Sequence, residues 1–190
     1  MPTETGIWDL AEARNHTVCE TLAKKLTHYL PLGIPVWDLG CGNGGYAKII
    51  EDAGFNVTGV EGTKDIAEIS SCSNVIEADL SQPLDASFPS HYKKSVVCLE
   101  VGEHIPPEFE NQFMDTLNHL CDKRLILSWA IPGQGGYHHV NEKTNTYIIE
   151  KMERYGLFIN HQDTINLRED IEDEYWWFRD TLMVFDRNPK

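Results

Sequence analysis

The sequence is poor in basic residues. Its 190 residues include 16 Lys and Arg against 30 Asp and Glu, which gives a formal net charge of −14. Proteins that bind nucleic acid or an anionic membrane through a broad positive face need clustered Lys and Arg. The composition therefore argues against nucleic acid as a partner, although it does not exclude a local basic groove.

Long hydrophobic runs and paired cysteines are also absent. The longest apolar segments, such as 125–131, have the length of a strand, whereas a membrane-spanning helix needs about 20 apolar residues. Segment 1–13 has no basic region followed by an apolar one, so we expect no secretory signal. The five cysteines are widely spaced and include no Cys-x-x-Cys pair, which argues against a disulfide framework and against a zinc ribbon. We expect a cytoplasmic protein with reduced thiols and no membrane partner.

Apolar segments of strand length alternate with segments of helical periodicity. Strands are predicted at 35–39, 55–61, 74–78, 95–99, 124–130, 157–160 and 181–185, and helices at 17–30, 46–53, about 109–120 and about 148–155. Thr17 and Glu20 form a candidate capping box for the first helix. This order predicts a single α/β domain over 1–190, with 1–30 as an amino-terminal helical cap. Its doubly wound, mostly parallel sheet of seven strands would carry helices on both faces.

The first predicted strand leads into a glycine-rich turn, Gly40-Cys41-Gly42-Asn43-Gly44-Gly45, and then a helix. Glycine allows positive φ and close approach of a ligand to the main chain, and a helix start offers free N–H groups. Such a turn is typical of a nucleotide site. Three of the glycines also match a dinucleotide fingerprint, and Glu61 ends the next predicted strand, where it can accept hydrogen bonds from ribose hydroxyls. This spacing alone leaves an NAD-dependent oxidoreductase open.

Asp38, two residues before the first glycine, favours a cationic ligand. Its carboxylate would repel a pyrophosphate but can pair with a cationic amino-acid group, which suits S-adenosylmethionine better than NAD. Here the sequence resembles the class I S-adenosylmethionine-dependent methyltransferases, of the type that acts on small molecules. Asp38, Gly40, Gly42 and Gly44 match that family's first motif, an acidic residue followed by alternating glycines.

The resemblance covers about 36–136 and implies roles for further residues. It implies that Glu61 binds the ribose hydroxyls and that Asp79 faces the adenine amine. Residues 100–105, Glu-Val-Gly-Glu-His-Ile, resemble a fourth-strand motif whose Glu-His pair lies over the methionine part of the cofactor. The implied cofactor is S-adenosylmethionine, with S-adenosylhomocysteine as product. The implied binding residues are Asp38, Gly40, Cys41, Gly42, Gly44, Glu61, Gly62, Asp79, Leu80 and Glu100.

Methyl transfer is a substitution at an activated carbon, so the protein must mainly align the acceptor, and a hydroxyl acceptor also needs a base. Three histidines follow the fourth and fifth strands: His104, and His138 and His139 in a glycine-rich loop. An imidazole with a pKa of about 6.5 can accept a proton at neutral pH. His139 is the preferred candidate for base or acceptor ligand, ahead of His104 and His138. His104 could instead belong to the cofactor pocket, and His16 is expected at the surface.

Two other groups have alternative interpretations. Glu103, His104 and His139 could form a divalent metal site, but magnesium prefers oxygen ligands, and no metal is assigned. Trp8 and the aromatic run at 175–178 could form a lid over a substrate, but large aromatic side chains more often fill a core, and the core is the expectation.

The expected function is transfer of a methyl group from S-adenosylmethionine to a small polar molecule, best matched by a hydroxyl of a sugar or nucleotide-sugar. The loop with His138 and His139 resembles one in relatives associated with sugar modification. A nucleic-acid methyltransferase is disfavoured because residues 105–108, Ile-Pro-Pro-Glu, lack the Asn/Asp-Pro-Pro-aromatic motif. An NAD-dependent oxidoreductase, a protein or peptide methyltransferase and a non-catalytic protein of the same fold stay as alternatives.

Overall fold

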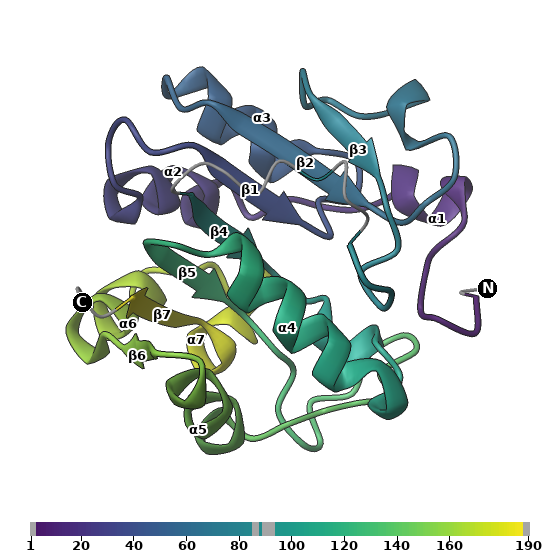
Figure 1. Cartoon of the computed structure of the whole chain (residues 1–190). Helices are drawn as coiled ribbons and strands as arrows, with labels where there is room; N and C mark the ends of the chain where they lie inside the picture. The colour runs from purple at the N-terminus through teal and green to yellow at the C-terminus, as the bar shows by residue number, and fades with distance from the viewer. Residues whose placement is uncertain (1–2, 85–87, 89–93, 188–190) are drawn as a thin grey trace.

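The computed structural model describes residues 3–84, 88 and 94–187, and its centre is one seven-stranded sheet (Figure 1). The strand order is β3-β2-β1-β4-β5-β7-β6, and β7 alone runs antiparallel to its neighbours. The strands are β1 Val36–Leu39, β2 Val57–Glu61, β3 Val75–Glu77, β4 Ser95–Cys98, β5 Arg124–Leu127, β6 Leu157–Ile159 and β7 Met183–Arg187. The predicted fold class is confirmed.

Helices cover both faces of the sheet, as a sheet buried on two sides requires. The α-helices are α1 Leu10–Arg14, α2 Glu20–Tyr29, α3 Gly45–Asp52, α4 Glu110–Leu120, α5 Asn145–Arg154, α6 His161–Arg168 and α7 Phe178–Thr181. Apolar side chains of α4 and α5 pack with Val96 and Leu125 on one face. Those of α2, α3 and α6 pack with Val97 and Ile126 on the other. Successive strand residues thus alternate between two cores.

Some local predictions were wrong. The helix α2 begins after Cys19, whose thiol accepts the Leu22 N–H, so Thr17 and Glu20 do not form the expected capping box. Helices α1, α6 and α7 were not predicted. In α6 only Thr164 and Leu167 are buried, which leaves almost no apolar periodicity to detect. Thr181, expected in the last strand, ends α7.

Two further expectations concern the chain as a whole. The domain boundaries, 1–190 with a cap at 1–30, stay a prediction. Within the described ranges, no helix has the length and apolar character needed to cross a bilayer. All five cysteines are buried and carry free thiols.

Candidate active site

The glycine turn between β1 and α3 has the conformation that its sequence predicts. Gly40, Gly42 and Gly44 have φ of +74°, +53° and +76°, a region that other residues rarely adopt. A Cβ on Gly40 would lie 2.3 Å from a methyl group of Val101. Glycine is therefore required there both by conformation and by the close approach of the chain after β4.

Glu61 connects the end of β2 to this turn. Its Oε2 accepts the Gly42 N–H at 3.0 Å, and its Oε1 accepts the N–H and the hydroxyl of Thr63 at 3.0 and 2.9 Å. The side chain is buried, and these three bonds fix its position. A carboxylate has about four lone-pair positions, so Glu61 can still accept a hydrogen bond from a ligand hydroxyl.

Asp38 lies beneath the turn and has one oxygen without a hydrogen-bond partner. Burial, and then the charge of Glu61, raise the pKa of Asp38 to about 7, against the opposing effect of the Ala47 N–H. Asp38, Gly42 and Gly44 line neither the cavity that contains Glu61 and Asp79 nor the cavity that contains His139. Asp38 can therefore affect a ligand in these cavities mainly through its charge.

A cavity of about 60 Å³ lies at the carboxyl ends of β1, β2 and β4. Six predicted cofactor residues line it: Gly40, Glu61, Gly62, Asp79, Leu80 and Glu100. The amino-terminal segment 5–8 covers it, because the side chain of Ile7 fills the space where a Cβ on Gly62 would be, and the Thr63 hydroxyl donates to the Trp8 carbonyl at 3.2 Å. From the sequence, Trp8 is a candidate for a lid but the core is favoured, and residues 5–7 have no predicted role.

A larger cavity of about 270 Å³ adjoins the first and shares Trp8, His16, Gly40, Glu100 and His104 with it. Cys41 and His139 also line it. Its other walls are largely aromatic, formed by Tyr46, Tyr137, Tyr175, Trp177 and Phe178. The assignment of the aromatic residues to the core was thus only partly right, and Trp176 is 46% exposed. His16 is exposed as expected, but it stands at the mouth of both cavities.

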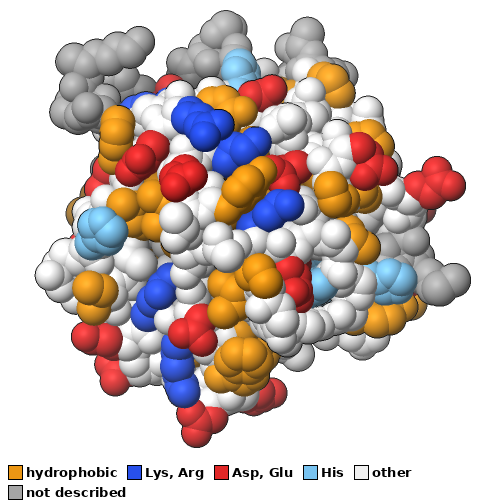
Figure 2. Space-filling view, turned by 90° about the horizontal axis from the view of Figure 1, so that it is seen from below, with side chains coloured by type: hydrophobic (Ala, Val, Ile, Leu, Met, Phe, Trp, Pro, Cys, Tyr) orange, Lys and Arg blue, Asp and Glu red, His pale blue; other side chains and the backbone are white. Residues whose placement is uncertain are grey.

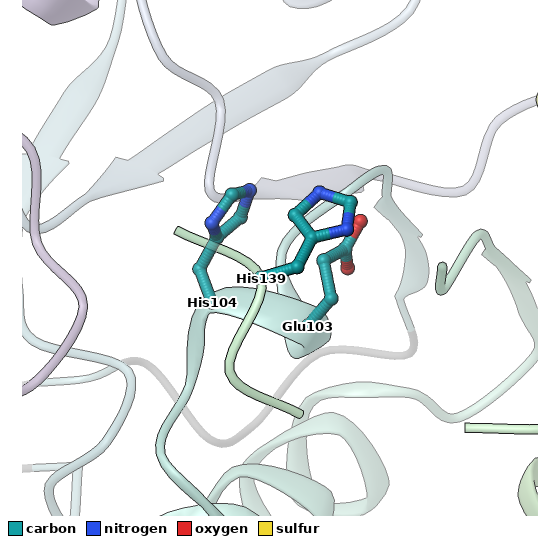
Figure 3. Close-up of side chains that lie close together, drawn as sticks. All are labelled: Glu103, His104 and His139. Carbon is teal, nitrogen blue, oxygen red and sulfur yellow. The ribbon is translucent and has the colours of Figure 1, made fainter. Parts of the chain in front are cut away.

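Two of the three candidate histidines lie together. The rings of His104 and His139 are 5.1 Å apart between centroids and meet edge to face at 81° (Figure 3). Burial, with a smaller effect of His139, lowers the pKa of His104 to about 4, so this ring is neutral at pH 7. His138 lines neither of these two cavities; it lines a third cavity of about 100 Å³, which it shares with His104.

Main-chain hydrogen bonds hold the loop after β5 against the short helix at Gly102–His104. The N–H groups of Val140 and Asn141 donate to the Glu103 carbonyl at 2.9 and 3.0 Å. His104 Nδ1 lies 3.2 Å from the His138 carbonyl. These contacts place His139 beside Glu103 and His104, although 35 positions separate His139 from His104 in the sequence.

Glu100 has a strained backbone, with φ of +55°. Its N–H donates to the Ser128 hydroxyl at 2.8 Å, and its Oε2 accepts from the Gln134 amide at 3.2 Å. Burial raises the pKa of Glu100. This carboxyl group lines both cavities, where it is placed to respond to a cationic ligand.

No family model matches the sequence. A relative of assigned function, 2-methyl-6-phytyl-1,4-hydroquinone methyltransferase of Synechocystis sp. (strain ATCC 27184 / PCC 6803 / Kazusa), is 34% identical over 82 residues. The match covers 40% of this chain and 26% of the relative, so the chain matches only about a quarter of that protein's length.

Solved structures match over most of the chain. Magnesium protoporphyrin IX methyltransferase from Synechocystis PCC 6803, with bound SAH, is 19% identical with a TM-score of 0.64, over 89% of this chain and 81% of that one. A SAM-dependent methyltransferase from Archaeoglobus fulgidus is 17% identical with a TM-score of 0.65, over 93% and 98%. The chain has the fold of the class I S-adenosylmethionine-dependent methyltransferases, which confirms the fold that the resemblance implied.

Proposed function

We propose that the protein transfers a methyl group from S-adenosylmethionine to a hydroxyl of a small polar molecule. One observation carries this proposal. Six of the predicted cofactor residues line a single cavity, which adjoins a second cavity lined by His104 and His139. A cofactor site thus adjoins an acceptor site, as methyl transfer in line with the breaking bond requires.

The electrostatics of the site favour S-adenosylmethionine over NAD. Asp38 is a buried and Glu100 a partly buried carboxyl group, both with raised pKa values, and Glu61 is a second buried acid. Such groups resist ionisation until a cation arrives. The sulfonium and ammonium groups of S-adenosylmethionine supply positive charge, whereas a pyrophosphate would add to the repulsion. This argument makes the NAD-dependent oxidoreductase the weaker alternative.

His139 is the residue that we propose to act on the acceptor, as base or as ligand. Its Nδ1 lies 3.3 Å from Glu142 Oε1, which orients the ring. A proton on Nδ1 satisfies that contact and leaves a lone pair on Nε2. His104 is a weak base because its pKa is about 4, well below the pH at which the enzyme would work. His104 therefore suits a positioning role better than proton transfer.

The reaction needs little else from the protein. As the acceptor oxygen forms its bond to the methyl carbon, the carbon–sulfur bond breaks and its electron pair returns to sulfur, which converts the sulfonium to a neutral thioether. The hydroxyl proton leaves to a base in the same step. Closing aromatic walls would exclude water that competes for the methyl group.

The larger cavity favours a small polar acceptor, with sugars as the first class to test. Aromatic faces such as those of Trp8 and Trp177 can stack on the C–H surfaces of a sugar ring. Figure 2 shows one face of the molecule, on which Lys and Arg side chains are interspersed with Asp and Glu. That mixture fits the low basic content, and this face offers no broad positive surface for nucleic acid. We further propose a cytoplasmic site of action, since all five cysteines carry free thiols.

The acceptor class can be tested with S-adenosylmethionine labelled in the methyl group. We expect transfer to members of a panel of sugars and nucleotide-sugars, and no transfer to a matched panel of peptides or to their carboxyl and amine groups. Mass spectrometry of the product should show a methyl ether. Transfer to peptides alone would contradict the small-molecule proposal and support the protein or peptide methyltransferase.

A further inference from the structure

Glu103 has a buried carboxyl group without a partner that explains its burial. The side chain is 0% exposed, and neither oxygen has a partner with full hydrogen-bond geometry among the described residues, although the main-chain N–H groups of Glu103 and Ala130 lie close enough to favour its charged form. Its polar neighbour is the Glu100 carboxyl group, with which it can share a hydrogen bond only if one of the two carries a proton. A buried acid of this kind needs either a proton or a cation.

Two imidazole groups stand beside this acid. Glu103, His104 and His139 each offer one donor atom, and the three atoms lie within 4.8 Å of one another. Figure 3 shows the two rings side by side, with the carboxyl group of Glu103 beside His139. Neither Glu100 nor Glu103 has a Lys or Arg partner within the part of the chain that the structure describes. The cluster therefore contains donors and no fixed positive charge.

The imidazole groups are also held as metal ligands usually are. A metal-binding histidine normally gives the N–H of its other ring nitrogen to a carboxylate or a main-chain carbonyl. Here His139 Nδ1 faces the Glu142 carboxylate at 3.3 Å, and His104 Nδ1 faces the His138 carbonyl at 3.2 Å. Protons on both Nδ1 atoms leave both Nε2 lone pairs for an ion.

We propose that Glu103, His104 and His139 bind a divalent transition-metal ion, which holds an oxygen of the methyl acceptor. Two imidazole nitrogens and a carboxylate suit zinc, cobalt, manganese or iron, whereas magnesium prefers oxygen ligands and keeps several waters. Three protein ligands leave coordination positions open, as in catalytic metal sites. This proposal replaces the expectation from the sequence that no metal binds. That expectation considered magnesium, which two histidine ligands disfavour. Its acceptor role rests on the proposed function, but the ion site does not.

A bound ion would act on the acceptor directly. The cluster borders the larger cavity through His104 and His139, so a hydroxyl that enters this cavity can reach an open coordination position. Coordination lowers the pKa of a bound hydroxyl, whose proton can pass to the Glu100 carboxylate. The oxygen then forms its bond to the methyl carbon as the carbon–sulfur pair returns to sulfur. An ion with two open positions selects acceptors with two adjacent oxygens, such as a vicinal diol.

Cobalt(II) is a suitable probe, because its visible spectrum reports nitrogen and oxygen ligation. The chelator-treated full-length protein should bind one Co²⁺ per chain and develop visible absorption bands. His139→Gln and Glu103→Gln should each weaken this binding by about 100-fold or more, since loss of an outer-shell partner alone costs 10–100-fold. His119→Ala, an exposed histidine of α4, should bind Co²⁺ as the unchanged protein does. Thermal melting of each variant checks that it is folded, and His139→Gln is the informative variant if Glu103→Gln does not fold.

The outcomes separate this proposal from the proposed function. Absence of Co²⁺ and Zn²⁺ binding at micromolar concentrations would overturn the metal site, as would binding that survives His139→Gln in the folded variant. Tighter binding of Mg²⁺ than of Co²⁺ would overturn the choice of ion. S-adenosylmethionine binding to the chelator-treated protein is measured in parallel. If it persists without any metal binding, only the metal site fails; if Co²⁺ binds but the cofactor does not, only the proposed function fails.

Discussion

Replacing His139 with alanine should lower methyl-transfer turnover by about 100-fold or more, the usual contribution of a positioned acid–base group. The affinity for S-adenosylmethionine should change by less than about twofold, because His139 borders the acceptor cavity and does not line the smaller cavity with Glu61 and Asp79. Loss of turnover at constant cofactor affinity marks an interaction made with the acceptor or in the transition state. Steady-state kinetics and a separate binding titration measure the two quantities.

Two other histidine variants serve as controls for this result. His119→Ala should keep full turnover, since that side chain is exposed on α4 and lines neither cavity. His138→Ala should have a smaller effect than His139→Ala, because His138 lines neither the cofactor cavity nor the larger cavity that contains His139. Full activity of His139→Ala would remove this residue from the reaction and transfer its role to His104 or to no histidine.

The second prediction concerns pH. The affinity for S-adenosylmethionine should rise by up to about tenfold per unit as the pH increases to 7, and then level off. The reason is that burial and Glu61 raise the pKa of Asp38 to about 7, so the empty site is protonated below that pH. A cationic ligand favours the ionised form, and binding below pH 7 must therefore release a proton. The ligand keeps its own charges in this range, since an α-amino group has a pKa of about 7.7–8.0.

Asp38→Asn is the matched control, since it keeps the shape and removes the titration. Its affinity should be lower than that of the unchanged protein at pH 7.5, by about 1–3 kcal/mol, and should vary less with pH. Calorimetry at pH 6 in two buffers of different ionisation enthalpy measures the protons released. The same pH dependence in Asp38→Asn would attribute the proton to Glu100 or Glu103, whose pKa values are also raised.

The cofactor side of the site could be predicted largely from the sequence. Short-range rules place Gly40 after one strand and Glu61 at the end of the next, and parallel strands bring their carboxyl ends to one edge. Six of the ten predicted cofactor residues line one cavity for that reason. Asp38 differs because it is buried beneath the turn, a feature that depends on how α3 packs and not on the motif.

The acceptor side depended on contacts between distant segments. Glu103 and His139 lie close together because two N–H groups of the loop donate to the Glu103 carbonyl. Hydrophobic periodicity in the sequence does not predict hydrogen bonds of this kind. Trp8 reaches the cavities because segment 5–8 crosses the edge of the sheet, with Ile7 against Gly62. Sequence reasoning could weigh Glu103, His104 and His139 as a metal site, but it could not know that the Glu103 carboxyl group is buried without a partner of full hydrogen-bond geometry.

The most direct test of the central claim is calorimetric titration of the purified protein with S-adenosylmethionine, S-adenosylhomocysteine and NAD in parallel. The cofactor cavity and its buried acids predict binding of the first two with dissociation constants on the order of 1 μM and no heat from NAD. Binding of NAD alone would support the oxidoreductase instead. Absence of binding by all three would contradict the proposed function. It would instead support a non-catalytic protein that has the same fold.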